Sequence, residues 1–301
     1  MSQQRIKESL VFKKDLVLKS ASDDELEELE YLFSKTVFNE DGKVINEKQY
    51  NARGVLMQEY IYKYNESGFL IEEILQEEDG IIAVHKTWEV DDKGKILREL
   101  HHYMDETFDT VTFFYDDKGK LIKKETVDPD GDLESIEQFT WVGDNITQML
   151  MQDADGDVLS EKNTRYDDKG NIIEVEEYDG SAGDSSKKEI EYYPSGNQKQ
   201  VLTYNDAGQL VEKVQMKEDS KKKIVQVVEE TTARKSTINF TFDGKGNIIQ
   251  QEEFNRNGEL VGKVSRVYDE HNMLLSSKVF IHGDGRGLSR NYTLRQEYVY
   301  Y

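Results

Sequence analysis

The sequence predicts an all-β protein, an elongated and twisted antiparallel meander of about twenty short strands. Its glycines recur with a period of about 26 residues in two interleaved series, as in repeat architectures. An aromatic residue followed by Asp or Asn precedes most of these glycines, which is typical of hairpin turns. The only two prolines, Pro129 and Pro194, each lie two positions before a turn glycine, so neither falls within a predicted strand.

The first 36 residues lie outside both glycine series. Ser22 and Glu25 have the spacing of a capping box, and leucines follow at near-helical intervals. We therefore expect a short helix over residues 23–33, in preference to a further pair of strands. Residues 1–36 would form an N-terminal cap, and residues 37–301 a repeat domain of about ten units.

The two series define the expected turns, with steps of 24 to 27 residues. The first series runs through Gly42, Gly68, Gly94, Gly119, Asn145, Gly170, Gly196, Lys222, Gly246 and Asn272. The second runs through Gly54, Gly80, Thr107, Gly131, Gly156, Gly183, Gly208, Arg234, Gly258 and Gly285. About eight residues separate successive turns, which is the length of one ordinary strand.

The phrase YDDKG at residues 115–119 and 166–170 shows how such a turn is built. The aromatic residue ends a strand, the first Asp accepts hydrogen bonds from turn amides, and the Gly supplies a positive φ that closes the hairpin with a bulge. The series are weakest over residues 216–235, where we expect a longer or irregular connection.

The predicted strands carry charges on both faces. In residues 121–127, LIKKETV, Lys and Glu occupy both sides of the alternation. Such a pattern favours a sheet that is single-layered or loosely coiled over one that packs against a second layer. The chain ends in the strand-like RQEYVYY, and we expect an open edge there that allows edge-to-edge self-association.

Aromatic residues mark the first series of turns more than the second. The position four before the turn is aromatic in eight of ten units of the first series and in four of the second. We call the following residues the aromatic stripe: Tyr64, Tyr115, Trp141, Tyr166, Tyr192, Phe242 and Tyr268. Packing as a narrow core is the favoured interpretation. The alternative is an exposed stripe that grips a partner.

No catalytic or cofactor-binding residues can be selected from the sequence. The chain has no Cys, and its five His lack metal-ligand spacing. Two groups of acidic residues resemble calcium loops, although their glycines do not match the EF-hand pattern: Asp128, Asp130, Asp132, Asp153, Asp155 and Asp157. Acidic turns are the favoured interpretation of both groups. An enzyme is the least supported class.

Several segments resemble the YD repeats of RHS-type proteins: YDDKGKLI at 115–122, YDDKGNII at 166–173 and YDEHNMLL at 268–275. YYPSGNQK at 192–199 resembles the related MORN-like variant found in toxin–antitoxin modules. The resemblance covers roughly residues 37–301 and implies a bacterial β-sheet repeat protein that shields, displays or binds another polypeptide. The chain is too short for the closed cocoon of large RHS toxins, so the encapsulating function is not carried over.

The formal charge of −22 argues against nucleic acid or an anionic membrane as a partner. We expect a cytoplasmic, non-catalytic interaction or scaffold protein that binds another protein, and the charge favours a basic one. The first alternative is an immunity or antitoxin-like protein that neutralises a basic toxin. The second is glycan or ligand binding through the aromatic stripe.

Overall fold

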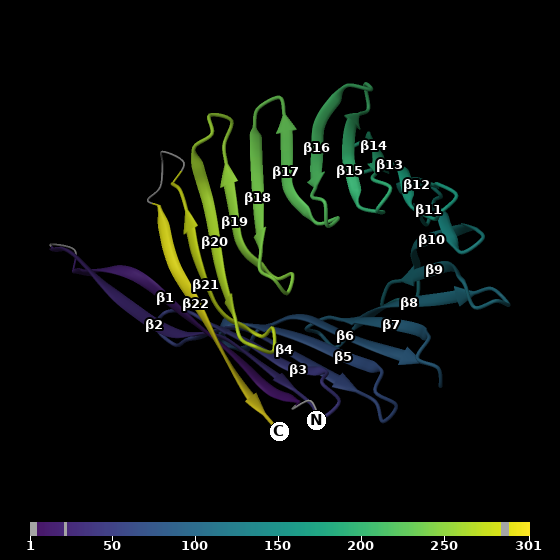
Figure 1. Ribbon diagram of the computed structural model, residues 1–301. Helices are drawn as coiled ribbons and strands as arrows, with labels where there is room; N and C mark the ends of the chain where they lie inside the picture. Colours follow the sequence, from purple (N-terminus) through teal and green to yellow (C-terminus); the bar gives the residue numbers. More distant parts are fainter. Residues whose placement is uncertain (1–4, 21–22, 284–288) are drawn as a thin grey trace. The chain divides into compact units, whose positions relative to one another are not determined.

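A computed structural model shows an all-β chain whose neighbouring strands run antiparallel (Figure 1). The structure describes residues 5–20, 23–283 and 289–301, without the side chains of 16–26. The described part contains 22 strands and one 3₁₀ turn, η1. The prediction of an all-β antiparallel fold is confirmed.

The chain divides into two compact units, residues 1–85 with 238–301, and residues 86–237. The elements that lie in the first unit or begin in it are β1 (Ile6–Ser20), β2 (Asp23–Phe38), β3 (Val44–Tyr50), β4 (Leu56–Tyr64), β5 (Leu70–Glu77), η1 (Glu78–Gly80), β6 (Ile82–Val90), β19 (Ile248–Phe254), β20 (Leu260–Tyr268), β21 (Leu274–Ile281) and β22 (Arg290–Tyr300). Those of the second unit are β7 (Ile96–His102), β8 (Phe108–Tyr115), β9 (Leu121–Val127), β10 (Leu133–Val142), β11 (Asn145–Asp153), β12 (Val158–Tyr166), β13 (Ile172–Asp179), β14 (Asp184–Tyr192), β15 (Gln198–Asn205), β16 (Leu210–Glu218), β17 (Ile224–Thr231) and β18 (Lys235–Phe242), the last of which ends in the first unit.

The hairpin turns have the predicted chemistry. In the turn between β12 and β13, the Asp167 amide donates to the Asn171 carbonyl (2.9 Å), and the Gly170 amide donates to the Asp167 carbonyl (3.0 Å). The Asp167 carboxylate accepts the amides of Lys169 and Asn171, both at 2.9 Å. Gly170 has a φ of 82°, and the register shifts by one residue beside the turn. This is a type I turn closed by a bulge.

Sixteen of the twenty predicted turn positions have a positive φ, including Lys222 and Asn272. Two predictions are displaced along the chain: Gly143, not Asn145, makes the turn between β10 and β11, and Glu106 takes the place of Thr107. Arg234 is outside the positive-φ region, and Gly285 lies outside the described residues.

The longer connection expected over residues 216–235 is not found, because β16 ends at Glu218, β17 spans Ile224–Thr231 and β18 begins at Lys235. The departure from the repeated turn is confined to residues 232–234, where no residue has a positive φ. Lys222 takes the positive φ that Gly supplies elsewhere, and the Asp219 carboxylate accepts the amides of Lys221 and Lys223 at 2.8 and 2.9 Å. The Asp therefore holds the turn even where the Gly is missing.

The helix expected over residues 23–33 is also wrong, because these residues form most of strand β2. Antiparallel pairing with β1 joins Phe12 to Leu32 and Leu18 to Leu26. A partner strand that satisfies the backbone outweighs the helical spacing of three leucines. Ser22, the expected cap, lies outside the described residues. β2 also crosses the expected boundary between residues 36 and 37.

The expected open edge at the C-terminus is absent. Strand β22 pairs with β21 on one side and with β1 on the other, from Ile6↔Tyr300 to Asp15↔Tyr292. The first and last strands of the meander are therefore joined, and β22 has a strand partner on both sides from Tyr292 to Arg295. The prediction of an open meander is wrong at this point.

Burial within each unit is shallow. Among the described residues the buried hydrophobic side chains are Phe139, Val175 and Val279, and no side chain is fully buried. In the second unit Phe139 and Val175 lie on the same face as Asp109, Ser135 and Thr164, which are also buried. One face of the sheet thus carries a thin core, and turn and ladder hydrogen bonds have a correspondingly large share in stability.

We predict that G258A destabilises the protein by about 1 to 2 kcal/mol, since Gly258 has a φ of 80° that an L side chain rarely adopts. Gly244 is a matched control in the same unit, because its φ is outside the positive region and a Cβ there would also meet open space. The free energy of unfolding in urea measures both. An equal cost for G244A would contradict the assigned role of the positive φ.

Turn carboxylates give a predicted dependence of stability on pH. Hydrogen bonds from the Lys95 and Lys223 amides hold the pKa values of Asp91 and Asp219 below the ordinary value. Their contribution is therefore complete above the unfolded pKa of about 3.9, and it is lost as pH falls through the folded pKa.

The substitutions D91N and D219N keep the side-chain acceptor, as Asn51 and Asn65 do elsewhere. We expect the double variant to lose less stability than the native protein between about pH 7 and pH 3. D92N is the control, because no described amide donates to the Asp92 carboxylate. The same acid loss in all three proteins would overturn this prediction.

Candidate functional site

The aromatic stripe is a hydrogen-bonded structural element in the second unit. Tyr115, Trp141, Tyr166 and Tyr192 are half-buried, and each donates to a backbone carbonyl of the adjacent strand, at 2.7 to 2.8 Å. Each of these strands has two neighbours, and a turn of the first edge connects it to only one of them. The acceptor carbonyl belongs to the other neighbour: Tyr166 on β12 donates to the Ile146 carbonyl on β11. These bonds therefore close the gaps between successive hairpins along the first turn edge.

The stripe residues of the first unit follow the same rule. Tyr64 donates to the Val44 carbonyl at 2.9 Å, and Tyr268 donates to the Ile248 carbonyl at 3.2 Å. Phe242 is half-buried and has no hydroxyl to donate. Burial raises the pKa of Tyr64, and burial with the nearby Asp91 raises that of Tyr115 in the second unit.

Lysines that follow turn glycines cover several of these rings. The Nζ atoms of Lys95 and Lys120 lie 4.4 and 4.9 Å from the ring centres of Tyr115 and Trp141. Lys43 lies 5.2 Å from Tyr64 in the same way. Such cation–π contacts each stabilise by about 0.5 to 1 kcal/mol at exposed sites. The stripe is therefore part of the scaffold on the first edge.

The second turn edge lacks this cover. Nine apolar or aromatic side chains of the second unit are exposed beside its turns, against three beside the first edge. Met104 is 86% exposed, Tyr103 51% and Leu210 46%. We call the nine side chains the apolar rim: Tyr103, Met104, Phe108, Leu133, Val158, Leu159, Tyr178, Leu210 and Val211. Exposed apolar surface of this extent is typical of protein interaction sites.

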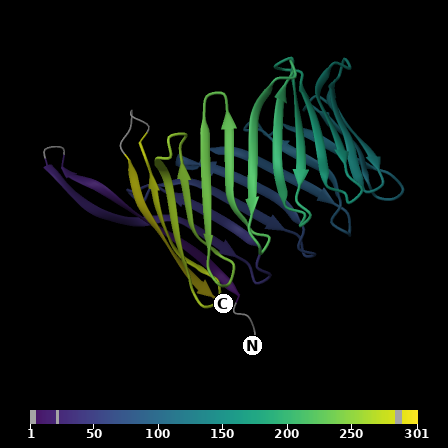
Figure 2. The same ribbon diagram turned by 45° about the horizontal axis from the view of Figure 1, so that its top comes forward.

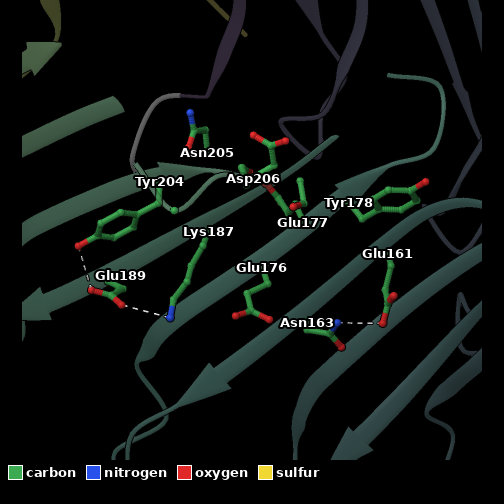
Figure 3. Close-up of a pocket in the computed structure, with 13 residues that line it drawn as sticks. Glu161, Asn163, Glu176, Glu177, Tyr178, Lys187, Glu189, Tyr204, Asn205 and Asp206 are labelled. Atoms are coloured by element: carbon green, nitrogen blue, oxygen red, sulfur yellow. Dashed lines mark hydrogen bonds and ion pairs between the residues drawn. The ribbon is translucent and has the colours of Figure 1, made fainter. Parts of the chain in front are cut away.

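An open depression of about 630 Å³ shares Tyr178 with the apolar rim. Figure 3 shows its lining residues. The depression is formed by strands β12 to β15 and the turn after β15. Its lining consists of Glu161, Asn163, Glu176, Glu177, Tyr178, Ser185, Ser186, Lys187, Glu189, Tyr204, Asn205, Asp206 and Gly208. Five of these residues are acidic and one is basic. We call this site the acidic depression.

Strand register explains the composition of the depression. Residues that pair across strands share a face, and the cross-strand row Asn163↔Glu176↔Lys187↔Tyr204 runs through its centre. The row lies on the face opposite the buried side chains Thr164 and Val175. Glu176, in the middle of this row, is exposed.

The ion pairs of the depression leave its negative charge incompletely matched. Lys187 pairs with Glu189 at 3.2 Å and with Glu174, outside the depression, at 2.7 Å. Tyr204 donates to Glu189 at 3.3 Å. Glu176 is exposed and has no hydrogen-bond or ion-pair partner among the described residues. A cation that enters the depression therefore meets an unpaired carboxylate.

Hydrogen bonds lower the pKa values of two carboxylates of this region, Glu161 and Glu174. Hydrogen bonds from Asn163 and Gln148, both at 2.9 Å, hold the pKa of Glu161 below its ordinary value. The hydrogen bond from Lys187 lowers the pKa of Glu174. An ionised carboxylate accepts hydrogen bonds and attracts cations but cannot act as a general acid. Five acidic residues against one basic residue in the lining favour electrostatic binding of cationic groups.

The structure places the calcium candidates in ordinary turns. The Asp128 carboxylate accepts the amides of Asp130 and Asp132 at 3.0 and 2.8 Å. Asp153 accepts those of Asp155 and Asp157 at 3.0 and 2.9 Å. Over the part of the chain that the structure describes, no group of three or more His, Cys, Asp or Glu has an arrangement that could hold a metal ion.

The sequence analysis did not find the acidic depression, because its residues come from four strands and only the register brings them together. The scarcity of aromatic residues in the second series was the one available signal. It indicated that the second turn edge would lack the aromatic side chains that pack along the first.

Comparisons with known proteins give the following. No family model and no curated protein matches the chain. Similar solved structures include a Photorhabdus luminescens Tc holotoxin pore, at 12% identity and a TM-score of 0.43, with 90% of this chain and 16% of that chain covered. A porin-like protein from Bacteroides uniformis is 11% identical with a TM-score of 0.31, and 98% and 96% of the two chains are covered.

The chain spans only 16% to 19% of the length of the Tc toxin chains that it matches. All of these TM-scores are below 0.5, so the similarities support no function for this chain. Within the described residues, no helix is long and apolar enough to cross a membrane.

We predict that Y166F lowers the free energy of unfolding by about 1 kcal/mol, because it removes one hydrogen bond to the Ile146 carbonyl. Y178F is the matched control, since no described residue accepts a hydrogen bond from the Tyr178 hydroxyl. Urea unfolding of both variants makes the comparison. If Y178F cost as much as Y166F, the stripe hydroxyls would not have the structural role assigned to them.

Proposed function

We propose that this protein is a non-catalytic interaction or scaffold protein that binds another polypeptide along the second turn edge of residues 86–237. The observation that carries the proposal is the acidic depression bordered by the apolar rim. Tyr178 belongs to both, so charge and apolar surface meet at one place. Interfaces commonly combine an apolar anchor with charged surroundings.

The partner's contact surface is basic in this proposal. Glu176 and Asp206 are exposed carboxylates of the depression, and the chain carries a formal charge of −22. Opposite charge accelerates encounter and selects the partner. Lysine or arginine side chains between apolar residues would therefore match this edge.

A neutralising role is a special case of the same proposal. A basic toxin would present the required charge. This protein would then bind the toxin as an immunity or antitoxin-like protein. Co-expression with a toxin encoded beside the gene, scored by cell survival, distinguishes this case from general scaffolding. Glycan binding through the aromatic stripe stays a prediction, and it has less support because most stripe residues donate their hydrogen bonds to the backbone.

The test is affinity capture at native expression with three baits: the native protein, E176K/D206K and D168K. Asp168 is an exposed turn acid of the same unit on the first edge, which makes D168K the matched control. We expect one partner to be captured by the native protein and by D168K and lost with E176K/D206K. Its capture should weaken as salt rises, because screening weakens exposed charge pairs.

Equal capture by all three baits would place the partner elsewhere on the protein. No specific partner for any bait would contradict the proposed function itself.

A further inference from the structure

The hairpin β1–β2 extends past the strands on either side of it, as Figures 1 and 2 show. β1 pairs with β22 only as far as Asp15, and β2 pairs with β3 only from Ser34 to Phe38. Among the described strands, β2 from Asp23 to Phe33 has a partner on one side alone, namely β1. Its other side is an edge with unpaired backbone amides and carbonyls, and such edges are templates for a further strand.

This free edge has a strongly acidic sequence. Residues 23–33, DDELEELEYLF, contain six acidic residues and no basic one. In a pairing with the same edge of a second copy, the six acids of each chain would lie side by side. Like charges directly opposite one another destabilise strand pairs, so a second copy is the less suitable occupant.

The opposite, paired side of β2 shows how the protein balances these acidic residues. Strand β1, which covers the other side of β2, contains Lys13, Lys14 and Lys19 among apolar residues. Lys14 pairs with Glu28 across the hairpin, and Arg295 of β22 pairs with Glu30 at 3.0 Å. Glu27 is exposed and has no partner among the described residues. Of the acidic side chains of β2 that the structure describes, Glu28 and Glu30 thus have cationic partners and Glu27 has none.

We infer that the free edge of β2, from Asp23 to Phe33, binds a basic, strand-forming segment of another polypeptide by β-strand addition. Main-chain hydrogen bonds supply the pairing, and lysine or arginine side chains face the carboxylates of β2. The inference rests on the proposed function only in that the partner is a polypeptide. Its surface lies on the first unit and shares no residue with the acidic depression.

The test uses the full chain and a labelled peptide of alternating lysine and valine, with fluorescence anisotropy for affinity. Hydrogen–deuterium exchange then locates the bound peptide. We expect protection of the amides of residues 27–33 on binding. Protection over β12 to β15 would report a second copy of the same basic peptide at the acidic depression, as the proposed function expects. The same peptide with N-methylated amides keeps its charge but cannot pair as a strand, so we expect its affinity to fall by about tenfold or more.

Protein variants separate the two surfaces. E27K/E28K should weaken binding of the lysine–valine peptide at residues 27–33 about tenfold through two reversed charges, and E176K/D206K should leave the protection of residues 27–33 unchanged. E27K alone provides a second variant that leaves the Lys14–Glu28 pair intact.

Three results would overturn the inference: no binding, equal affinity for the N-methylated peptide, or protection over β12 to β15 alone, with loss in E176K/D206K. The last result would at the same time support the proposed function, so the two failures are distinguishable. Concentration-dependent dimers that protect residues 27–33 without peptide would identify a second copy as the occupant and also overturn it.

Discussion

Backbone hydrogen bonds at the described hairpin turns set the register of the strands that they join. Side chains alternate between the faces of a sheet, so a slip of one residue would move a whole strand's side chains to the opposite face. At Asp167 the turn length is fixed by backbone bonds, by the Asp carboxylate and by the positive φ of Gly170. Repetition of this turn about every 26 residues keeps the aromatic stripe on one turn edge. Because few side chains are buried, local turn chemistry has to supply the specificity that a thick core gives other folds.

The two turn edges differ in side-chain exposure because only the first edge carries the aromatic stripe. On the first edge, Tyr166 and its equivalents bond to the neighbouring strand that no turn connects there, and several lysines cover the rings. On the second edge, apolar side chains such as Met104 and Leu210 stay exposed, and the acidic depression opens beside them. A surface that contributes little to stability can be specialised for a partner, and this asymmetry is the physical basis of the proposed function.

Sequence reasoning predicted the parts of the fold that depend on local chemistry. The Asp and Gly of each YDDKG phrase determine a turn by themselves, so the strands and most turn positions could be predicted. Thr107 and Asn145 were misplaced because the positive φ falls on the neighbours Glu106 and Gly143. The pairing of β1 with β22 and the strand at residues 23–33 depend on contacts between distant segments, which periodicity does not encode. The acidic depression was missed for the same reason: Asn163, Glu176 and Lys187 become neighbours only through register.

The central claim is that the first edge is scaffold and the second edge is the binding surface. Hydroxyl-radical footprinting of the protein, free and bound to its natural partner, tests this most directly because it reports the exposure of individual side chains. Binding is expected to lower the reactivity of Met104, Tyr178 and Leu210, while Tyr115 and Tyr166 keep theirs. Lower reactivity of Tyr115 and Tyr166 with no change at Met104 and Leu210 would contradict it.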